Sequence, residues 1–197
     1  MNVYDDIRKL LSSLTFDNMY ISVSDIKYKL GTDSKLISKI IEMVICSTLK
    51  KYCTQNKIQF EINPIQNSYP DFILYHDNQP IAVDIKTTYR ISENKINGCT
   101  LGTYKGYFRD RSSNKNIRKP YSEFTDHLCI VALYDRTEDS VLVKDIFITE
   151  KWKIASNRTG SGNTCNIGSM TNIDALRNGP SFFSSKAEFD TYWMNYE

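Results

Sequence analysis

The chain has 197 residues, a formal net charge of +2 and 41% hydrophobic residues. That balance is typical of a globular protein with a sizeable core, and it excludes disordered and fibrous classes. We expect a single domain over residues 1–197. No apolar run is long enough to cross a bilayer, and the chain does not open with a basic segment followed by an apolar run. We therefore expect a cytoplasmic protein without membrane association.

The N-terminal part of the chain predicts two helices separated by a hairpin. Residues 3–14 place apolar side chains at helical spacing. Residues 19–30 predict two short strands around Ser24-Asp25. A longer helix is expected from about Ser34, with Asp33 or Ser34 as its N-cap.

The remainder of the chain is dominated by strand patterns. We expect strands at 58–62, 70–75, 80–86 and 127–134 and near 141–148, a polar glycine loop over 156–169, and a helix at about 185–194. The last begins with Ser185-x-x-Glu188, a capping-box pattern. This order predicts an α/β (α+β) fold with a mixed central sheet flanked by helices.

Two neighbouring strand patterns bring acidic residues and a lysine together. Because strand side chains alternate, Asp84 and Lys86 share the face opposite the isoleucines of that strand. Asp71 directly follows Pro70 at the start of the preceding strand, so pairing of the two strands brings Asp71 near Asp84. Two adjacent carboxylates repel unless a cation joins them, and Mg²⁺ prefers such oxygen ligands. A nearby lysine can orient water or stabilise charge on a phosphate.

Glu42 is a candidate third acidic group at the edge of the apolar stripe of the long helix. The residues alone leave blander alternatives open. Asp84 and Lys86 can form an ion pair at a strand end, Asp71 can be a turn residue, and Glu42 can be a solvated helix residue. The motif is short enough to arise by chance.

A basic segment lies between Tyr104 and Lys119, with six basic residues and one acidic residue. The basic residues are Lys105, Arg109, Arg111, Lys115, Arg118 and Lys119. A positive patch interleaved with aromatic residues suits a phosphate backbone. The alternative is a solvated basic loop.

Six stretches of the chain carry a family resemblance. They are QNSYPDFILY (66–75), IAVDIKTTY (81–89), TLGTY (100–104), KWKIA (151–155), GSGNTCNIGS (160–169) and EFDTYWMNY (188–196), with weaker similarity over 30–43. The chain resembles the EcoRV-like type II restriction endonucleases within the PD-(D/E)XK nuclease superfamily. The resemblance implies a restriction-endonuclease-like fold and a Mg²⁺-dependent homodimer that cuts double-stranded DNA within a palindrome. The implied site is GATATC, cut at its centre to leave blunt ends with 5′-phosphates, and a companion methyltransferase acting on the same site is expected.

The resemblance also implies roles for individual residues. Asp71, Asp84 and Glu42 are the expected metal-site acids, and Lys86 is the motif lysine. The expected DNA contacts are Gln66, Asn67, Thr87, Thr88, Thr100, Gly160, Ser161, Gly162, Asn163, Thr164 and Asn166, and the basic segment adds Arg118 and Lys119. The implied recognition loop spans 156–170, and the hairpin at about 19–32 is the expected dimer contact.

The chemistry of the glycine loop agrees with that role. An asparagine amide can bond N6 and N7 of adenine together, and glycines let backbone groups approach base edges. Cys165 and Ile65 depart from the pattern of the relatives.

Two other functions remain open: a repair or junction nuclease of the same superfamily, and a DNA-binding protein without catalysis. A different palindrome or a modified-base requirement would indicate the first, whereas the intact Asp71, Asp84 and Lys86 set argues against the second.

Overall fold

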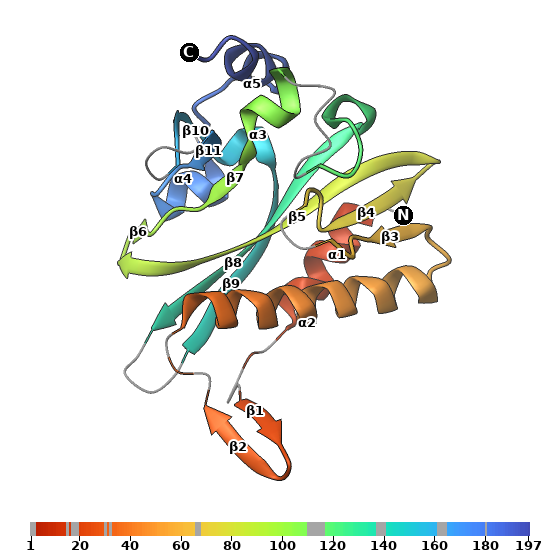
Figure 1. The fold of residues 1–197 in the computed structure, drawn as a ribbon, viewed down its shortest axis with the longest axis vertical. Helices are drawn as coiled ribbons and strands as arrows, with labels where there is room; N and C mark the ends of the chain where they lie inside the picture. Colours follow the sequence, from red (N-terminus) through yellow and green to blue (C-terminus); the bar gives the residue numbers. More distant parts are fainter. Residues whose placement is uncertain are drawn as a thin grey trace.

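The structure, a computed structural model, describes residues 3–14, 16, 20–29, 31, 33–65, 68–109, 117–136, 141–160, 165–179 and 181–197. Its centre is a mixed sheet in the order β3-β4-β5-β8-β9, with β6 paired to β5 (Figure 1). The strands are β3 (Phe60–Ile62), β4 (Phe72–His76), β5 (Gln79–Ser92), β6 (Lys95–Ile96), β8 (Asp126–Arg136) and β9 (Val141–Glu150). β5 and β8 are parallel, whereas the other pairs are antiparallel. The expected mixed sheet is confirmed.

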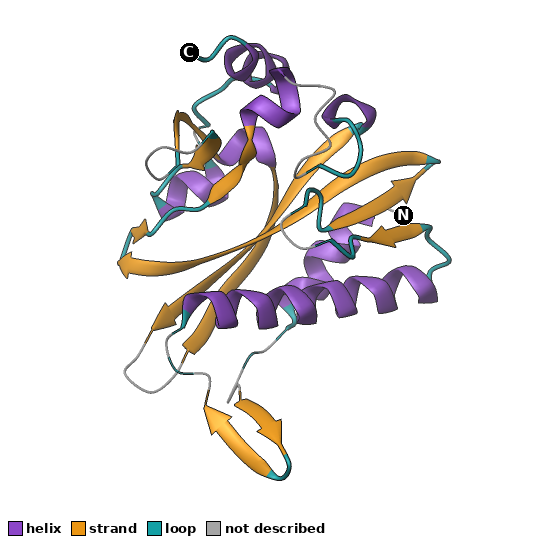
Figure 2. Cartoon of the chain, viewed as in Figure 1, coloured by secondary structure: helices purple, strands orange, loops and turns teal. Residues whose placement is uncertain are grey.

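Helices and a smaller sheet cover the two faces of the central sheet (Figure 2). On one face lie α1 (Val3–Ser12) and α2 (Ser34–Gln55). The other face carries β7 (Thr100–Thr103), a π-helix (Lys105–Arg109), a 3₁₀ turn (Tyr121–Glu123), α3 (Lys151–Ile154), β10 (Ala155–Thr159), β11 (Asn166–Ser169), α4 (Ile173–Asn178) and α5 (Lys186–Met194). None of the helices in the described residues is long and apolar enough to span a bilayer.

Alternation along the central strands divides the core in two. On β8, Leu128 and Ile130 belong to the cluster under α1 and α2, whereas Cys129 and Val131 belong to the cluster under the C-terminal helices. Successive strand side chains point to opposite faces, so a strand covered on both sides is apolar throughout. This explains the continuous apolar run of β8.

The long helix α2 forms where the sequence predicts it. The Asp33 side chain accepts hydrogen bonds from the backbone N–H groups of Lys35 and Leu36 and so caps the helix. Ile37, Ile41, Ile45 and Leu49 are at most 1% exposed and bury one stripe against the sheet. Each such burial contributes about 1.5–3 kcal/mol. The stripe fixes the rotation of the helix and with it the direction in which Glu42 projects.

The predicted hairpin is present as β1 (Tyr20–Val23) and β2 (Ile26–Lys29), joined by a two-residue turn at Ser24-Asp25. Both turn residues have positive φ, 46° and 67°, as tight hairpin turns require. The hairpin projects from the rest of the molecule at the bottom of Figure 1. Its apolar side chains are exposed, including Val23 at 53% and Ile26 at 56%.

Two expectations need correction. The segment 156–169, expected as one loop, is largely strand: β10 pairs with β11, and β11 pairs with β7. Its Asn, Ser and Gly residues have low strand propensity, so tertiary pairing rather than local preference forms these strands. The aromatic residues of the basic segment, Tyr104, Tyr107 and Phe108, lie in the core. They are therefore not free to stack on bases.

Candidate active site

The candidate site lies at the start of β4, where β5 runs on beyond its pairing with β4 while it still pairs with β8. The antiparallel register pairs Phe72 with Val83, so Asp71 comes next, opposite Asp84. The Oδ2 atom of Asp71 accepts a hydrogen bond of 2.7 Å from the backbone N–H of Ile85. The Asp71 carboxylate therefore accepts the hydrogen bond that the Ile85 N–H would donate to the backbone of a longer β4. The strand pairing predicted to bring Asp71 and Asp84 together is confirmed.

Asp84 is held between two ammonium groups. It is 3% exposed, and its Oδ1 accepts a hydrogen bond of 2.8 Å from Nζ of Lys86. Its Oδ2 lies 3.3 Å from Nζ of Lys151. This second contact is an ion pair without good hydrogen-bond geometry, since Oδ2 makes no hydrogen bond within the described part of the chain. Each oxygen of the carboxylate thus faces its own cation.

The two aspartates titrate differently because their surroundings differ. Burial and the neighbouring Asp84 carboxylate raise the pKa of Asp71 to about 7. Burial alone would raise the pKa of Asp84, but Lys86 and Lys151 outweigh it and hold that pKa below its usual value. For Lys86, burial acts in the opposite direction and would lower the pKa. The Asp84 and Asp71 carboxylates outweigh burial and raise the pKa of Lys86 above its usual value. Without a metal, Asp84 is therefore ionised while Asp71 is partly protonated near neutral pH.

Lys151 was not expected at the site. It is 1% exposed, and its Nζ donates a hydrogen bond of 2.9 Å to the backbone oxygen of Leu101. The same atom lies 3.8 Å from the ring centroid of Tyr69 and 4.9 Å from that of Tyr107. Burial lowers the pKa of Lys151, against the attraction of Asp84. Sequence reasoning missed Lys151, because lysine is mostly exposed in proteins and its position in the chain does not indicate burial.

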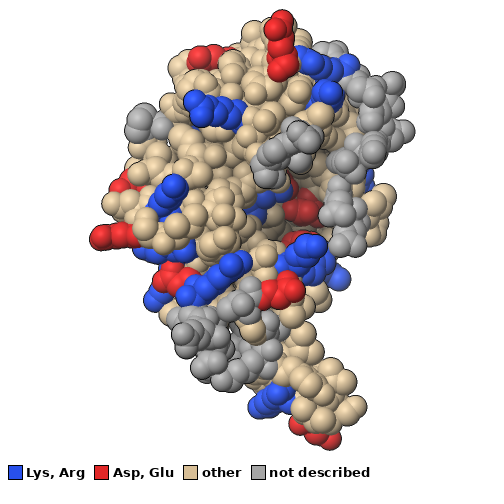
Figure 3. Space-filling model, turned by 60° about the vertical axis from the view of Figure 1, so that its left-hand side comes forward, with Lys and Arg blue, Asp and Glu red and all other residues tan. Residues whose placement is uncertain are grey.

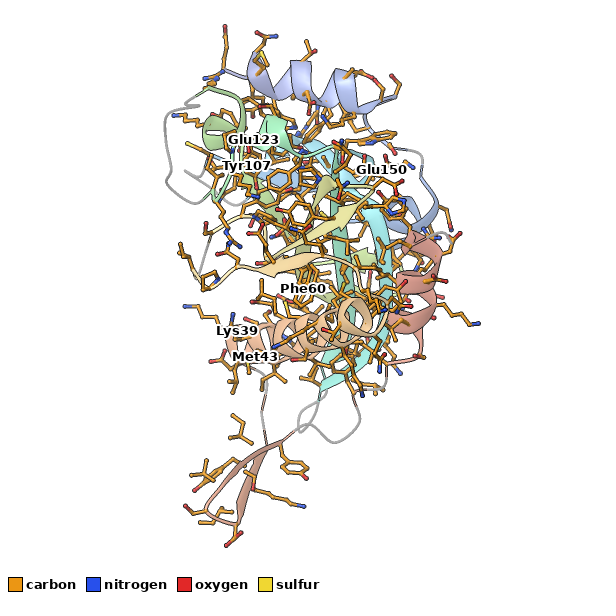
Figure 4. The ribbon with its side chains drawn as sticks, turned by 90° about the vertical axis from the view of Figure 1, so that its right-hand side faces the viewer. Lys39, Met43, Phe60, Tyr107, Glu123 and Glu150 are labelled. Atoms are coloured by element: carbon orange, nitrogen blue, oxygen red, sulfur yellow. The ribbon has the colours of Figure 1, made fainter. Side chains whose placement is uncertain are left out.

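Asp71, Asp84 and Lys86 open into a cleft of about 1130 Å³. Figure 3 shows acidic and basic side chains meeting in a hollow on this face. The lining comes from α2, from the segment between β3 and β4, from β5, and on the far wall from β7, β11 and the π-helix. Lys39 and Tyr107, two of the lining residues, are labelled below and above the strand that carries Phe60 in Figure 4. The cleft is far larger than a site for one small ion.

Glu42 lies in this cleft but is already paired. Its Oε1 is 2.6 Å from Nζ of Lys39, one turn earlier on α2. Among the described residues, no three His, Cys, Asp or Glu side chains are gathered into a metal-ligand set. Glu42 is thus not gathered into one ligand set with Asp71 and Asp84, and its carboxylate pairs with Lys39. Its expected part in metal binding stays a prediction. The two aspartates still suit Mg²⁺, which binds through one or two carboxylates and keeps waters or phosphate oxygens as its other ligands.

Part of the expected DNA-contacting set gathers on the far wall of the cleft. Thr100 and Asn166 line it. The Gly160 N–H donates a hydrogen bond of 2.8 Å to the backbone oxygen of Asn166. A Cβ on Gly160 would lie 2.7 Å from Cγ2 of Thr100, so Gly160 permits a close approach to β7. The base of the glycine loop is therefore packed beside the candidate active site.

Other expected contacts are engaged within the protein. Thr87 is hydrogen-bonded to Ser38 of α2, and Thr88 is 3% exposed and donates to the Gly98 backbone oxygen. The Arg118 guanidinium lies 2.6 Å from Glu61, and Lys119 lies 3.3 Å from the same carboxylate. Gln66, Asn67, Ser161, Gly162, Asn163 and Thr164 lie outside the described residues.

Comparisons with known proteins identify relatives of this chain. The family model described as "Restriction endonuclease EcoRV" matches residues 18–197. The chain is 37% identical over 193 residues to the type II restriction enzyme EcoRV of Escherichia coli, covering 86% of this chain and 78% of the relative. The solved structure of the NlaIV restriction endonuclease superposes with a TM-score of 0.63 at 17% identity. That match covers 98% of this chain and 78% of the other. At that identity, the similarity to NlaIV shows a shared fold.

Proposed function

Because the chain belongs to the EcoRV family of type II restriction endonucleases, we propose that it hydrolyses DNA with Mg²⁺ at the Asp71–Asp84–Lys86 site. The observation that carries this proposal is the β4–β5 register, which sets Asp71 opposite Asp84, with Nζ of Lys86 2.8 Å from the Asp84 carboxylate. Two carboxylates on opposite residues of paired strands repel each other, and a divalent cation bound by both relieves that repulsion. They lie in a cleft large enough for a nucleic acid strand, with the motif lysine beside them.

Each residue has a distinct part in the reaction. Asp71 and Asp84 would hold the cation, and the backbone N–H of Ile85 fixes the orientation of the Asp71 carboxylate through its hydrogen bond to Oδ2. When bound, Mg²⁺ supplies positive charge that offsets charge developing on the reacting phosphate. Lys86 is 22% exposed at its side chain and lines the cleft, so its ammonium can reach the scissile phosphate or the attacking water.

The proposed substrate is the palindrome GATATC, cut at its centre to leave blunt ends with 5′-phosphates. Support comes from the 37% identity to EcoRV and from the loop base that packs against Thr100. Residues 161–164, which include Asn163, lie between Gly160 and Cys165 and supply the proposed base contacts. An asparagine side chain is suited to adenine in the major groove.

Cutting both strands of a palindrome calls for two active sites related by a dyad, and hence for a homodimer. The hairpin β1–β2 supports this, because Tyr20, Val23, Ile26 and Tyr28 are each about half exposed, from 48% to 56%. A lone two-stranded hairpin is marginally stable, and exposed apolar clusters mark interaction surfaces. A companion DNA methyltransferase and a cytoplasmic location complete the proposal, because an unprotected genome would be cut.

Digestion of a long DNA of known sequence tests the activity. With Mg²⁺ the proposal predicts a fixed set of discrete fragments that match the positions of one palindrome, and with EDTA it predicts intact DNA. Cleavage only at branched or damaged substrates would instead favour the repair-nuclease alternative. Sequence-selective binding without cleavage in any divalent metal would indicate a protein that has lost catalysis.

A further inference from the structure

Lys151 approaches Asp84 from inside the protein, on the side away from solvent. Its side chain is 1% exposed, whereas that of Lys86, the other ammonium on Asp84, is 22% exposed. Since Lys86 already pairs with Asp84, neutralising one carboxylate does not call for a second buried lysine. Burying an ammonium group costs hydration free energy, which ion pairs and hydrogen bonds must offset. The hydrogen bond from Lys151 to the Leu101 backbone oxygen indicates a role beyond neutralising Asp84.

We propose that Lys151 is a positioning residue that couples the base of the recognition loop to the Asp84 carboxylate. The proposal rests on the proposed function of the Asp71–Asp84–Lys86 site and of the loop. Lys151 itself does not reach the cleft and is not expected to touch the substrate.

Both sides of the loop base meet at this lysine. On one side, α3 carries Lys151 and continues directly into β10, which leads to Gly160. On the other side, Leu101 belongs to β7, which pairs with β11 through Thr100↔Gly168 and Thr103↔Asn166. The ammonium therefore joins Asp84 to the strand that holds the return segment of the loop.

The surroundings leave the lysine little freedom. The Tyr107 hydroxyl lies 3.3 Å from the Leu101 oxygen, to which it donates, and 3.4 Å from Nζ of Lys151. A Cβ on Gly102 would lie 1.7 Å from that hydroxyl, so Tyr107 packs directly on the β7 backbone. In Figure 4, Tyr107 and Glu150, the residue before Lys151, both lie in the upper half of the molecule, with the loop-base elements. Any displacement of β7 must therefore move Lys151, and with it the orientation of Asp84.

This arrangement makes the coupling measurable. When the correct base sequence engages the loop, β7 and β11 are held in one position and Lys151 holds Asp84 in its productive orientation. Without that link, the loop still binds DNA but no longer aligns the carboxylate. Removing Lys151 should therefore slow the preferred site more than a site with one changed base pair, because only the preferred site uses the coupling.

Two variants and one control test the coupling. Lys151→Met removes the ammonium and keeps much of its apolar stem. Tyr107→Phe removes only the hydroxyl that bonds the Leu101 oxygen. Lys153→Met is the control, because Lys153 lies on the same short helix but is 47% exposed and pairs with Glu150. The measurements are kcat and KM on the preferred duplex and on single-base variants, Mn²⁺ binding without DNA, and the melting temperature.

For Lys151→Met we expect kcat on the preferred duplex to fall about a hundredfold with KM nearly unchanged. Discrimination against single-base variants should fall about tenfold. Mn²⁺ should bind the DNA-free protein several-fold more tightly, because a positive charge beside Asp84 is gone. Tyr107→Phe should lower discrimination in the same direction and to a smaller extent, while Lys153→Met should match the wild type.

Equal loss of rate on every duplex, with Mn²⁺ binding unchanged, would overturn the proposal and leave Lys151 as a core residue. If Lys151→Met does not fold, Tyr107→Phe decides, and unaltered discrimination in that variant overturns the coupling. Failure of the proposed function is distinguishable, because the wild type would then cut no duplex. In that case the Mn²⁺ measurement still tests the Lys151–Asp84 contact, and unchanged affinity overturns the proposal.

Discussion

Asp71 faces Asp84 across the end of the β4–β5 ladder, and its Oδ2 accepts the hydrogen bond of the first unpaired N–H, that of Ile85. A carboxylate that ends a ladder in this way is fixed by the backbone rather than by another side chain. The strand register therefore determines the proposed metal site, and shifting that register by one residue would turn Asp84 and Lys86 to the opposite face of the sheet.

Lys86 should be needed for cleavage and not for DNA binding. Its ammonium pairs with Asp84 inside the cleft, where a single duplex phosphate can reach it. We expect Lys86→Ala to lower the rate of cleavage about a hundredfold or more. Binding in Ca²⁺, measured by gel shift, should change little, because many other phosphate contacts remain. Lys9→Ala, an exposed lysine on α1, is the control. A parallel loss of binding and cleavage would make Lys86 mainly a DNA contact.

The pH dependence of the free energy of unfolding should reflect the raised pKa of the Asp71 carboxyl. Its pKa in the folded protein, about 7, is above the usual 3.8. The stability that its proton contributes is therefore fully present below about pH 4 and is lost as pH rises through 7. In EDTA at pH 8, we expect Asp71→Asn to raise the free energy of unfolding by roughly 2–4 kcal/mol. That advantage should shrink towards pH 4.

Excess Mg²⁺ provides the internal control for this measurement. It should stabilise the wild type at pH 8, since a cation that binds only the folded state shifts the equilibrium towards it. It should not stabilise Asp71→Asn to the same extent. Urea titrations at several pH values give both results. An Asp71→Asn protein less stable than the wild type at pH 8 in EDTA would contradict the assigned direction of the shift.

The hairpin should hold two chains together. Val23 and Ile26 face each other across β1 and β2 and are both more than half exposed. The double change Val23→Glu and Ile26→Lys removes the apolar surface but leaves an opposite-charge pair that supports the hairpin. We expect sedimentation at micromolar concentration to show a dimer for the wild type and a monomer for this variant. Ile91→Lys, another apolar residue 54% exposed, should remain dimeric. A wild-type monomer, free and on DNA, would contradict the proposed assembly.

Different substitutions should weaken base recognition and phosphate binding independently of each other. A good bidentate contact contributes roughly 1–3 kcal/mol of discrimination. We therefore expect Asn163→Ala to weaken binding to GATATC in Ca²⁺ by at least about tenfold, with binding to unrelated duplexes nearly unchanged. Arg118→Ala should weaken binding to all duplexes and flatten its salt dependence, since it removes the phosphate contact that we propose for Arg118. If Asn163→Ala weakens every duplex equally, the loop contacts the backbone rather than the bases.

Much of the fold could be predicted because its patterns are local. Short apolar runs bounded by polar or turn residues located β4, β5 and β8, and the cap at Asp33 located the start of α2. The strands β7, β10 and β11 were missed because their short, polar and glycine-containing sequences acquire strand structure only by pairing with one another. The burial of Tyr107 was missed for a similar reason, since the basic residues around it indicated a surface segment.

The part of the candidate site that the β4–β5 pairing determines could be predicted from the sequence. Asp84 and Lys86 are two residues apart and therefore share a face, and Asp71 follows from the pairing with β4. Lys151 is 67 residues from Asp84 in the chain and reaches it only through the tertiary fold. The engagement of Glu42 by Lys39 depends on side-chain conformation, and a helical spacing of three residues permits such a pair without requiring it.

The most direct test of the central claim is to sequence the ends that the protein leaves on a plasmid with one GATATC site. In Mg²⁺, the wild type should convert the plasmid to a single linear product with blunt ends at the centre of that site and 5′-phosphates. A folded Asp84→Ala protein should leave the plasmid intact. Ends at scattered or unrelated positions, or full cleavage by the folded Asp84→Ala protein, would contradict the account.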